Sequence, residues 1–212
     1  VVVRVVDDAG ETLGSTVLLL TRVPGEEESG GDTTVLVAPL IGLAAAPTIG
    51  ADGTERVDPT LADRAGALAD GLALATDLPV TLVPRPETVE ALARSDRGRE
   101  ALDRLDRLPG QRQVVDGPYV DVPTAAWVDR GMTEELTRQR ERGTTVLNEH
   151  LGRTDSSVWD GRSGATPGTL AALWPVGVRT VVLTPESLVD AATPSGPVTV
   201  DAGDGRSVDA VA

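Results

Sequence analysis

Five short apolar runs alternate along the chain with stretches of helical periodicity, and this alternation limits the possible folds more than any other feature. The runs lie near positions 35, 80, 114, 157 and 181. Unbroken apolar strands are typical of a sheet that is buried on both faces. Because each run is followed by a segment long enough for a crossover helix, we expect the five strands to lie side by side and parallel.

Helix boundary signals agree with this alternation. Asp58-Pro59 and Thr166-Pro167 pair a capping residue with a proline, which is typical of a helix N-terminus, and Gly152 is typical of a C-terminus. We expect helices over residues 58–75, 87–93 continuing through 98–108, 124–130, 133–151 and 166–173. The last strand that the pattern predicts covers residues 197–200, and a turn follows at 201–206.

The predicted fold class is therefore α/β, an incomplete or distorted (β/α) barrel of parallel strands preceded by a short β segment. A full eight-fold barrel takes about 250 residues, and the chain has 212. An open doubly wound sheet is the alternative, although we find no glycine fingerprint of a dinucleotide site. We expect residues 1–24 to be a β segment, either an edge of the sheet or the tail of a preceding β domain, and residues 33–212 to be a truncated barrel-like domain. Because residues 1–6 already have the pattern of a strand, we expect the chain to be a piece of a longer protein.

Charge and residue types exclude several kinds of function. The net charge of −14 disfavours nucleic acids and anionic membrane surfaces as partners, whereas neutral glycans, basic peptides and cations remain open. The chain has no cysteine and a single histidine, His150, so thiolate sites, His-based zinc sites and Ser-His-Asp triads are not expected. We therefore predict no metal and no cofactor. No apolar run reaches about 18 residues, so no membrane span is expected.

In either architecture, functional side chains collect at the carboxyl ends of the strands. The third run is followed by Tyr119 and Asp121, and the fourth by Trp159 and Asp160. The two aromatic residues offer faces for a sugar ring. The two carboxylates offer hydrogen bonds to its hydroxyls, or the acid and base of a glycosidase. Arg85, after the second run, is a further candidate for ligand binding.

Each candidate also has a purely structural explanation. Asp121 is placed to cap the helix that follows it, and Tyr119 to plug the mouth of a barrel. Trp159 and Asp160 fit a barrel rim followed by an Asp-Gly turn, and Arg85 fits an ion pair with a nearby acid. The charged stretch at residues 138–142 is expected to be a solvated helix face.

All basic side chains other than His150 are arginine, which indicates the codon bias of a high-GC genome, with a halophilic source as the alternative.

The chain resembles an uncharacterised family of large, secreted, membrane-anchored envelope proteins of high-GC bacteria. The resemblance lies in short motifs at residues 20–24, 37–40, 81–84, 117–121 and 158–161. The resemblance implies a (β/α) barrel of the glycoside hydrolase and polysaccharide deacetylase kind, preceded by a β domain. It covers most of the chain from residue 15 to residue 190.

The chain departs from that family at three of its motifs. Arg85-Pro86 stands where the family has Asp-Pro, the second acid after Asp121 is missing, and Trp159-Asp160 replaces a Trp-Pro pair. The paired histidines of metal-dependent deacetylases are absent, so deacetylation is not expected. These departures favour a site that has lost an ancestral activity.

Three functions follow as expectations. The leading one is a non-catalytic or degenerate barrel domain at the extracellular face of the cell envelope, which binds cell-wall polysaccharide or another envelope protein. The first alternative is a glycoside hydrolase that uses Asp121 and Asp160. The second is a structural or assembly domain, which predicts no cleft at all.

Overall fold

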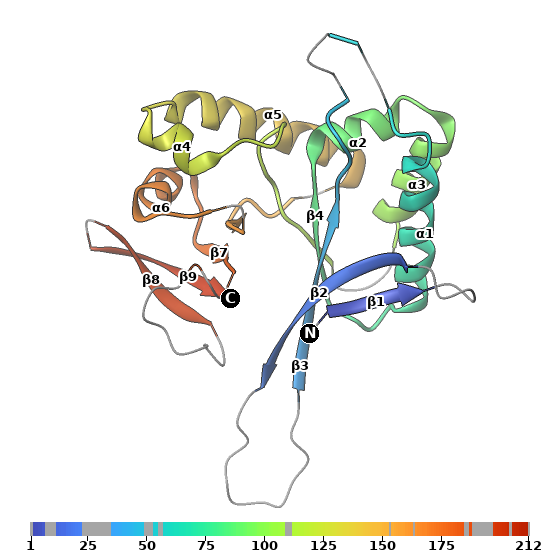
Figure 1. The fold of residues 1–212 in the computed structure, drawn as a ribbon, viewed down its shortest axis with the longest axis horizontal. Helices are drawn as coiled ribbons and strands as arrows, with labels where there is room; N and C mark the ends of the chain where they lie inside the picture. The colour runs from blue at the N-terminus through green and yellow to red at the C-terminus, as the bar shows by residue number, and fades with distance from the viewer. Residues whose placement is uncertain are drawn as a thin grey trace, which may run out of the picture.

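The computed structural model describes residues 2–6, 12–22, 35–48, 53–54, 57–108, 112–152, 154–162, 164–184, 187, 197–203 and 205–211 (Figure 1). One group of strands comprises β1 (Val2–Val6), β2 (Thr12–Arg22), β3 (Val35–Leu43), β4 (Val80–Pro84) and β5 (Arg112–Val114). A second group comprises β6 (Val158–Asp160), β7 (Thr180–Val182), β8 (Val198–Gly203) and β9 (Arg206–Val211). They form two sheets, with the orders β1-β2-β3-β4-β5 and β6-β7-β9-β8.

The parallel arrangement predicted for the five apolar runs is confirmed. β3, β4 and β5 are parallel neighbours in the first sheet, and β6 and β7 are parallel neighbours in the second. Val115, directly after β5, forms a parallel bridge with Asp155, and the Asp155 N–H donates to the Val114 carbonyl at 2.7 Å. A parallel bridge therefore joins the two sheets, and all five runs point the same way.

The strands do not close into a barrel in the part of the chain that the structure describes. β1 and β8 are the outer strands of their sheets, and each has a neighbour on one side only. The observed architecture is a mixed α/β fold with parallel strands and helices. At the N-terminal side, β1 pairs with β2 and β2 pairs with β3, both antiparallel, so the N-terminal β segment extends the first sheet.

Six α-helices and the 3-10 helix η1 have both of their ends within the described residues. They are α1 (Leu61–Leu74), α2 (Pro86–Ala93), α3 (Asp96–Asp106), α4 (Thr124–Asp129), α5 (Thr133–Leu151), α6 (Pro167–Leu173) and η1 (Trp174–Val176). α5 has the bounds that the sequence predicts, and the Thr166 hydroxyl accepts from the Thr169 N–H as an N-cap. α2 and α3 are separate helices because Ser95 caps α3, accepting from the Gly98 N–H at 3.1 Å.

The prediction that the strand at residues 197–200 is the last one is wrong. After a turn, β9 returns and lies between β7 and β8, parallel to β7 and antiparallel to β8. Its side chains alternate, since Val208 and Ala210 are buried while Ser207 and Asp209 are exposed. This strand has one buried face and one exposed face, so it lacks the unbroken apolar run by which the other strands were recognised.

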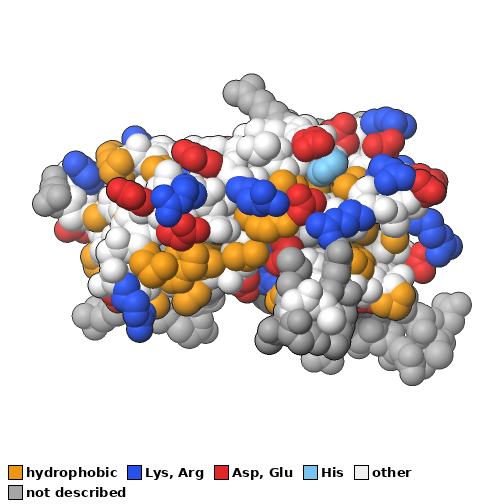
Figure 2. Space-filling view, turned by 90° about the horizontal axis from the view of Figure 1, so that it is seen from above, with side chains coloured by type: hydrophobic (Ala, Val, Ile, Leu, Met, Phe, Trp, Pro, Cys, Tyr) orange, Lys and Arg blue, Asp and Glu red, His pale blue; other side chains and the backbone are white. Residues whose placement is uncertain are grey.

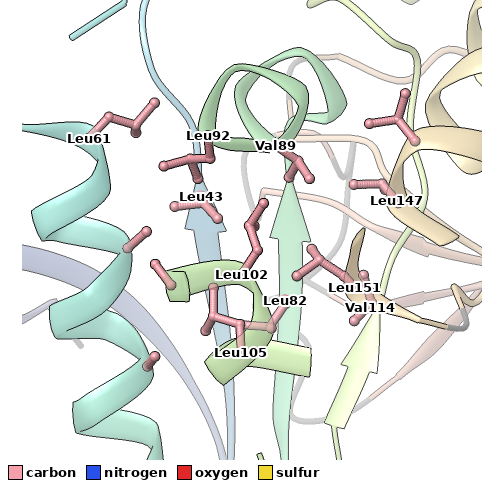
Figure 3. Close-up of a cluster of buried hydrophobic side chains, with 14 of the residues drawn as sticks. Leu43, Leu61, Leu82, Val89, Leu92, Leu102, Leu105, Val114, Leu147 and Leu151 are labelled. Atoms are coloured by element: carbon pink, nitrogen blue, oxygen red, sulfur yellow. The ribbon is translucent and has the colours of Figure 1, made fainter. Parts of the chain in front are cut away.

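Alternate side chains of the parallel strands pack into two layers. One layer takes a single residue from the strand or strand end of each run: Leu40, Val83, Val115, Val158 and Val182. On the other face, the helices cover the sheets. Figure 3 shows the larger part of this layer, where leucines and valines of α1, α2, α3 and α5 pack against β3, β4 and β5. α6 and the strands of the second sheet build the smaller part around Leu170, Val181 and Val208.

A helix that crosses a bilayer must be both long and apolar, and this sets a test for the described helices. None of them combines the length and the apolar character that a membrane-crossing helix needs.

Candidate functional site

A hollow of about 410 Å³ lies at the carboxyl ends of β4, β5 and β6. We call it the cleft. It is lined by Gly42, Ala44, Val83, Pro84, Arg85, Pro86, Asp116, Gly117, Pro118, Val120, Asp121, Val122, Thr124, Trp159, Asp160 and Arg162. Figure 2 views the molecule from the side on which β3 and β4 end, where charged side chains of both signs are interspersed with apolar ones.

Strand periodicity explains why two of the predicted residues reach the cleft. Side chains two positions apart on a strand share a face. Arg85 lies two residues beyond Val83, and Asp160 lies two residues beyond Val158. Both valines belong to the layer that takes one residue from each run. Arg85 and Asp160 therefore continue that layer at the point where the strands end and the cleft begins.

Arg85 and Asp121 form an ion pair at the cleft. The Arg85 Nη2 donates to Asp121 Oδ2 at 2.7 Å, and Nη1 donates to the Ala45 carbonyl at 2.9 Å. The Asp121 side chain is 65% exposed. α4 begins after Pro123 and has no side-chain cap, so the capping role considered for Asp121 is not observed. The pairing considered for Arg85 is observed, and its acid is Asp121.

Asp160 is held by Arg162, which the sequence analysis did not single out. Arg162 Nε and Nη2 each donate to a different carboxylate oxygen of Asp160, both at 2.8 Å, and the Arg162 N–H donates to Oδ1 at 3.2 Å. The hydrogen bonds to Asp160 raise the pKa of Arg162 above its ordinary value. Both oxygens of Asp160 are thus occupied by one guanidinium, which is a strong and directional pairing.

Trp159 borders the cleft without offering it a ring face. The residue is 3% exposed and packs in the core with Leu170 and Val181. The Arg140 guanidinium carbon lies 5.6 Å from the centroid of its ring. A ligand that stacks on this ring would first have to displace these neighbours.

Tyr119 is not among the residues that line the cleft. Its ring packs against the helix-side core, its hydroxyl donates to Glu90, and the Arg142 guanidinium carbon lies 4.2 Å from the ring centroid. The Tyr119 N–H donates to the Gln139 carbonyl at 2.9 Å, and its own carbonyl accepts from the Glu87 N–H at 3.1 Å. Tyr119 therefore fastens the segment between β5 and α4 to α2 and α5, behind the cleft wall.

The titration of Tyr119 tests this placement, because it is the only tyrosine of the chain. Burial, followed by the hydrogen bond to Glu90, raises the pKa of Tyr119 above its ordinary value of 10.0, and Arg142 opposes the shift. We expect the tyrosinate absorbance of the folded protein to rise at a pH above 10.0. Glu90→Gln should lower that midpoint and Arg142→Ala should raise it. A midpoint that neither substitution moves would contradict the described contacts.

The sign of the stability effect follows from the same shift. A tyrosine whose pKa is raised by folding binds its proton more tightly in the folded state. Its contribution to the free energy of unfolding is complete below the unfolded value of about 10 and is lost as the pH rises through the folded value. The urea midpoint should therefore fall more steeply above pH 10 in the parent than in Tyr119→Phe.

A buried ion pair beneath the cleft was missed in the sequence. Asp116 lines the cleft, and Arg140 of α5 donates to both of its oxygens, with side-chain exposures of 1% and 6%. The expectation that the charged stretch 138–142 is a solvated face is wrong for Arg140. The helical spacing was the available signal: Arg140 lies four residues after Leu136 and seven before Leu147, both of which are buried.

Each carboxylate that lines the cleft is paired with an arginine. Asp121 is paired with Arg85, Asp160 with Arg162 and Asp116 with Arg140. Carboxylates accept hydrogen bonds and guanidinium groups donate them, so such a lining can hydrogen-bond the hydroxyls of a neutral ligand in both directions. Within the described ranges, no cluster of three or more His, Asp or Glu side chains could hold a metal ion.

A second hollow, of about 570 Å³, lies where the start of α1 meets the junction of α2 and α3. It is lined by Val57, Asp58, Pro59, Leu61, Ala62, Ala91, Leu92, Arg94, Ser95, Asp96 and Arg97. None of these residues lies directly at the carboxyl end of a parallel strand, where α/β folds place their ligands. We therefore take the cleft as the candidate functional site.

No protein-family model matches the sequence. No curated protein matches it in sequence either. The fold resembles that of solved structures, among them a 4-alpha-glucanotransferase from Thermococcus litoralis, with a TM-score of 0.63 and 15% sequence identity. The match covers 81% of this chain and 26% of the glucanotransferase, so the chain spans about a quarter of that enzyme's length. At this identity the likeness concerns the fold alone.

Proposed function

We propose that this chain is a non-catalytic binding domain whose cleft takes a neutral, hydroxyl-rich ligand such as a cell-wall glycan. The observation that carries the proposal is the pairing of every cleft carboxylate with its own arginine. An ionic ligand gains little from a lining whose charges already cancel, whereas hydroxyls can both donate to the carboxylates and accept from the guanidinium groups. A likeness in fold to a glucanotransferase supports the choice of glycan among hydroxyl-rich ligands.

The envelope setting belongs to the same proposal. It is motivated by the resemblance of the short motifs to the envelope family. In the other version of this proposal, the cleft binds an envelope protein instead of a glycan. A structural or assembly domain requires no cleft at the strand ends. The presence of a lined hollow there favours a binding role over that alternative.

Isothermal titration with neutral α-1,4-glucan oligosaccharides and neutral wall-glycan fragments tests the proposal. We expect Arg85→Ala to weaken binding about tenfold or more, because it removes a charged donor and leaves Asp121 without its partner. Arg107→Ala is the matched control, since Arg107 forms an exposed ion pair with Asp103 on α3, outside the cleft lining. Equal affinities of the two variants would mean that the ligand binds outside the cleft. If no glycan binds, the structural or assembly role would be favoured instead.

A glycoside hydrolase is the second candidate, because Asp121 and Asp160 line the same cleft from neighbouring strand ends. The reaction needs one carboxylic acid that protonates the leaving oxygen and a second carboxylate that acts as nucleophile or base. Arg162 occupies both oxygens of Asp160, which opposes either role unless the pair opens. Release of new reducing ends that is abolished by both Asp121→Asn and Asp160→Asn would replace the non-catalytic proposal by this one.

A further inference from the structure

One buried arginine contacts both walls of the cleft. On the first wall, Arg140 Nε donates to the two oxygens of Asp116 at 3.2 Å, and Nη2 donates to Oδ1 at 3.1 Å. Asp116 follows β5 and stands in the segment that leads to Asp121. The Thr144 hydroxyl, one turn further along α5, donates to Asp116 Oδ2 at 3.0 Å and completes the arrangement.

The same guanidinium reaches the second wall. Arg140 Nη2 donates to the carbonyl of Ser156, two residues before β6 begins, and its guanidinium carbon faces the Trp159 ring. Nη1 donates to the Val176 carbonyl at 3.0 Å. Trp159 is the neighbour of Asp160 in the chain, so this group of contacts fixes the strand that carries Asp160.

These side-chain contacts matter because few backbone hydrogen bonds join the two walls. Among the described residues, the first sheet and the second sheet share a single bridge, between Val115 and Asp155. An arginine guanidinium is planar and rigid and presents its donors at fixed angles. A group of this kind, bonded to both sides of a narrow junction, sets their separation.

We propose that Arg140 is a positioning residue that fixes the distance between the wall carrying Asp121 and the wall carrying Asp160. Its effect on ligand affinity rests on the proposed function, whereas its effect on the separation of the walls does not. The cleft is then assembled before any ligand arrives, with α5 as the element that holds it.

Spin labels measure the separation directly. The chain has no cysteine, so Asp121→Cys and Asp160→Cys introduce two labelling sites and no others. We expect a single narrow distance distribution when Arg140 is present. The further pair Asp116→Leu with Arg140→Met removes both buried charges together, so that no unpaired carboxylate is left, and should broaden the distribution and shift its mean. An unchanged distribution would overturn the proposal.

Matched variants separate positioning from general stability. Val146→Ala removes buried volume from the same helix and leaves the hydrogen bonds of Arg140 intact, so we expect it to leave the distribution unchanged. If Val146→Ala broadened the distribution as much as Asp116→Leu/Arg140→Met does, the proposal would be overturned. If that pair does not fold, Thr144→Val replaces it, since it deletes one donor to Asp116, and the same criteria apply. Arg140→Lys, which keeps the charge and loses the planar fork, should fall between the parent and the charge-removal pair.

The ligand measurement distinguishes this proposal from the proposed function. With Asp121 and Asp160 intact, Asp116→Leu/Arg140→Met should weaken oligosaccharide binding at least tenfold, and Val146→Ala should not. If the parent binds no oligosaccharide, the proposed function fails while the label distances still decide the role of Arg140. If affinity is unchanged although the distribution is broad, Arg140 does not position the binding groups.

Discussion

Replacing Arg140 by methionine is expected to lower the free energy of unfolding by about 3–5 kcal/mol. Methionine fills much of the same space, so the loss is not mainly one of packing. It leaves the Asp116 carboxylate, 1% exposed, with the Thr144 hydroxyl as its remaining side-chain donor. The substitution also removes the hydrogen bonds that Arg140 donates to the Ser156 and Val176 carbonyls. Urea denaturation followed by circular dichroism at pH 7 measures the change.

Two further variants show whether the buried charge is the cause. Asp116→Leu/Arg140→Met should recover most of the lost stability, because replacing both partners of a buried pair by apolar side chains is often close to neutral. Arg107→Ala, which breaks an exposed pair on α3, should cost at most about 1 kcal/mol. If Arg140→Met costs no more than Arg107→Ala, then Asp116 is hydrated and the buried pair does not hold the two walls.

The strands that sequence analysis found and the one that it missed differ in burial. The runs of β3, β4 and β7 are apolar on both faces, so they stand out without any knowledge of their neighbours. β9 is buried on one face, and its alternation of Ser207, Val208, Asp209 and Ala210 is short. Its place between β7 and β8 depends on long-range pairing, which local pattern does not contain.

Strand ends predicted where the cleft lies and that Arg85, Asp121 and Asp160 line it, but not how Trp159 and Tyr119 are oriented. Neighbouring residues of a strand point to opposite faces. Because Asp160 is still part of β6, Trp159 beside it faces the helices, and the two cannot serve one ligand as platform and acid. This exclusion could be predicted from the sequence once the strand was extended by one residue. The orientation of Tyr119 could not, since it follows β5 in an irregular segment that α2 and α5 hold.

The contacts of α5 were the least predictable part of the site. Its bounds follow from helical periodicity, and so does its buried stripe. The stripe contains Arg140 and Gly143. From local sequence alone, an arginine is expected to be solvated and a glycine to be a weak helix former. Gly143 is explained by the segment after β5 that packs on this stripe, and Arg140 by that segment together with the Ser156 and Val176 carbonyls.

Gly143→Ala is therefore expected to destabilise the protein by about 3 kcal/mol, against the usual benefit of alanine in a helix. A Cβ at this position would overlap the Gly117 carbonyl oxygen and lie 3.0 Å from Pro86 Cγ and 3.2 Å from the Tyr119 nitrogen. The backbone cannot retreat easily, because the Tyr119 N–H is bonded to the Gln139 carbonyl. Relief requires that α5 and the cleft wall move apart.

Gly71→Ala is the matched control for this effect, because Gly71 is an exposed interior residue of α1 and a Cβ there meets nothing within 4 Å. It should raise the free energy of unfolding by about 0.5–1 kcal/mol through helix propensity alone. The two substitutions make the same chemical change in two helices and are expected to have opposite signs. Stabilisation by both would mean that α5 does not press on the segment carrying Asp116 and Tyr119, and the cleft wall would then need another support.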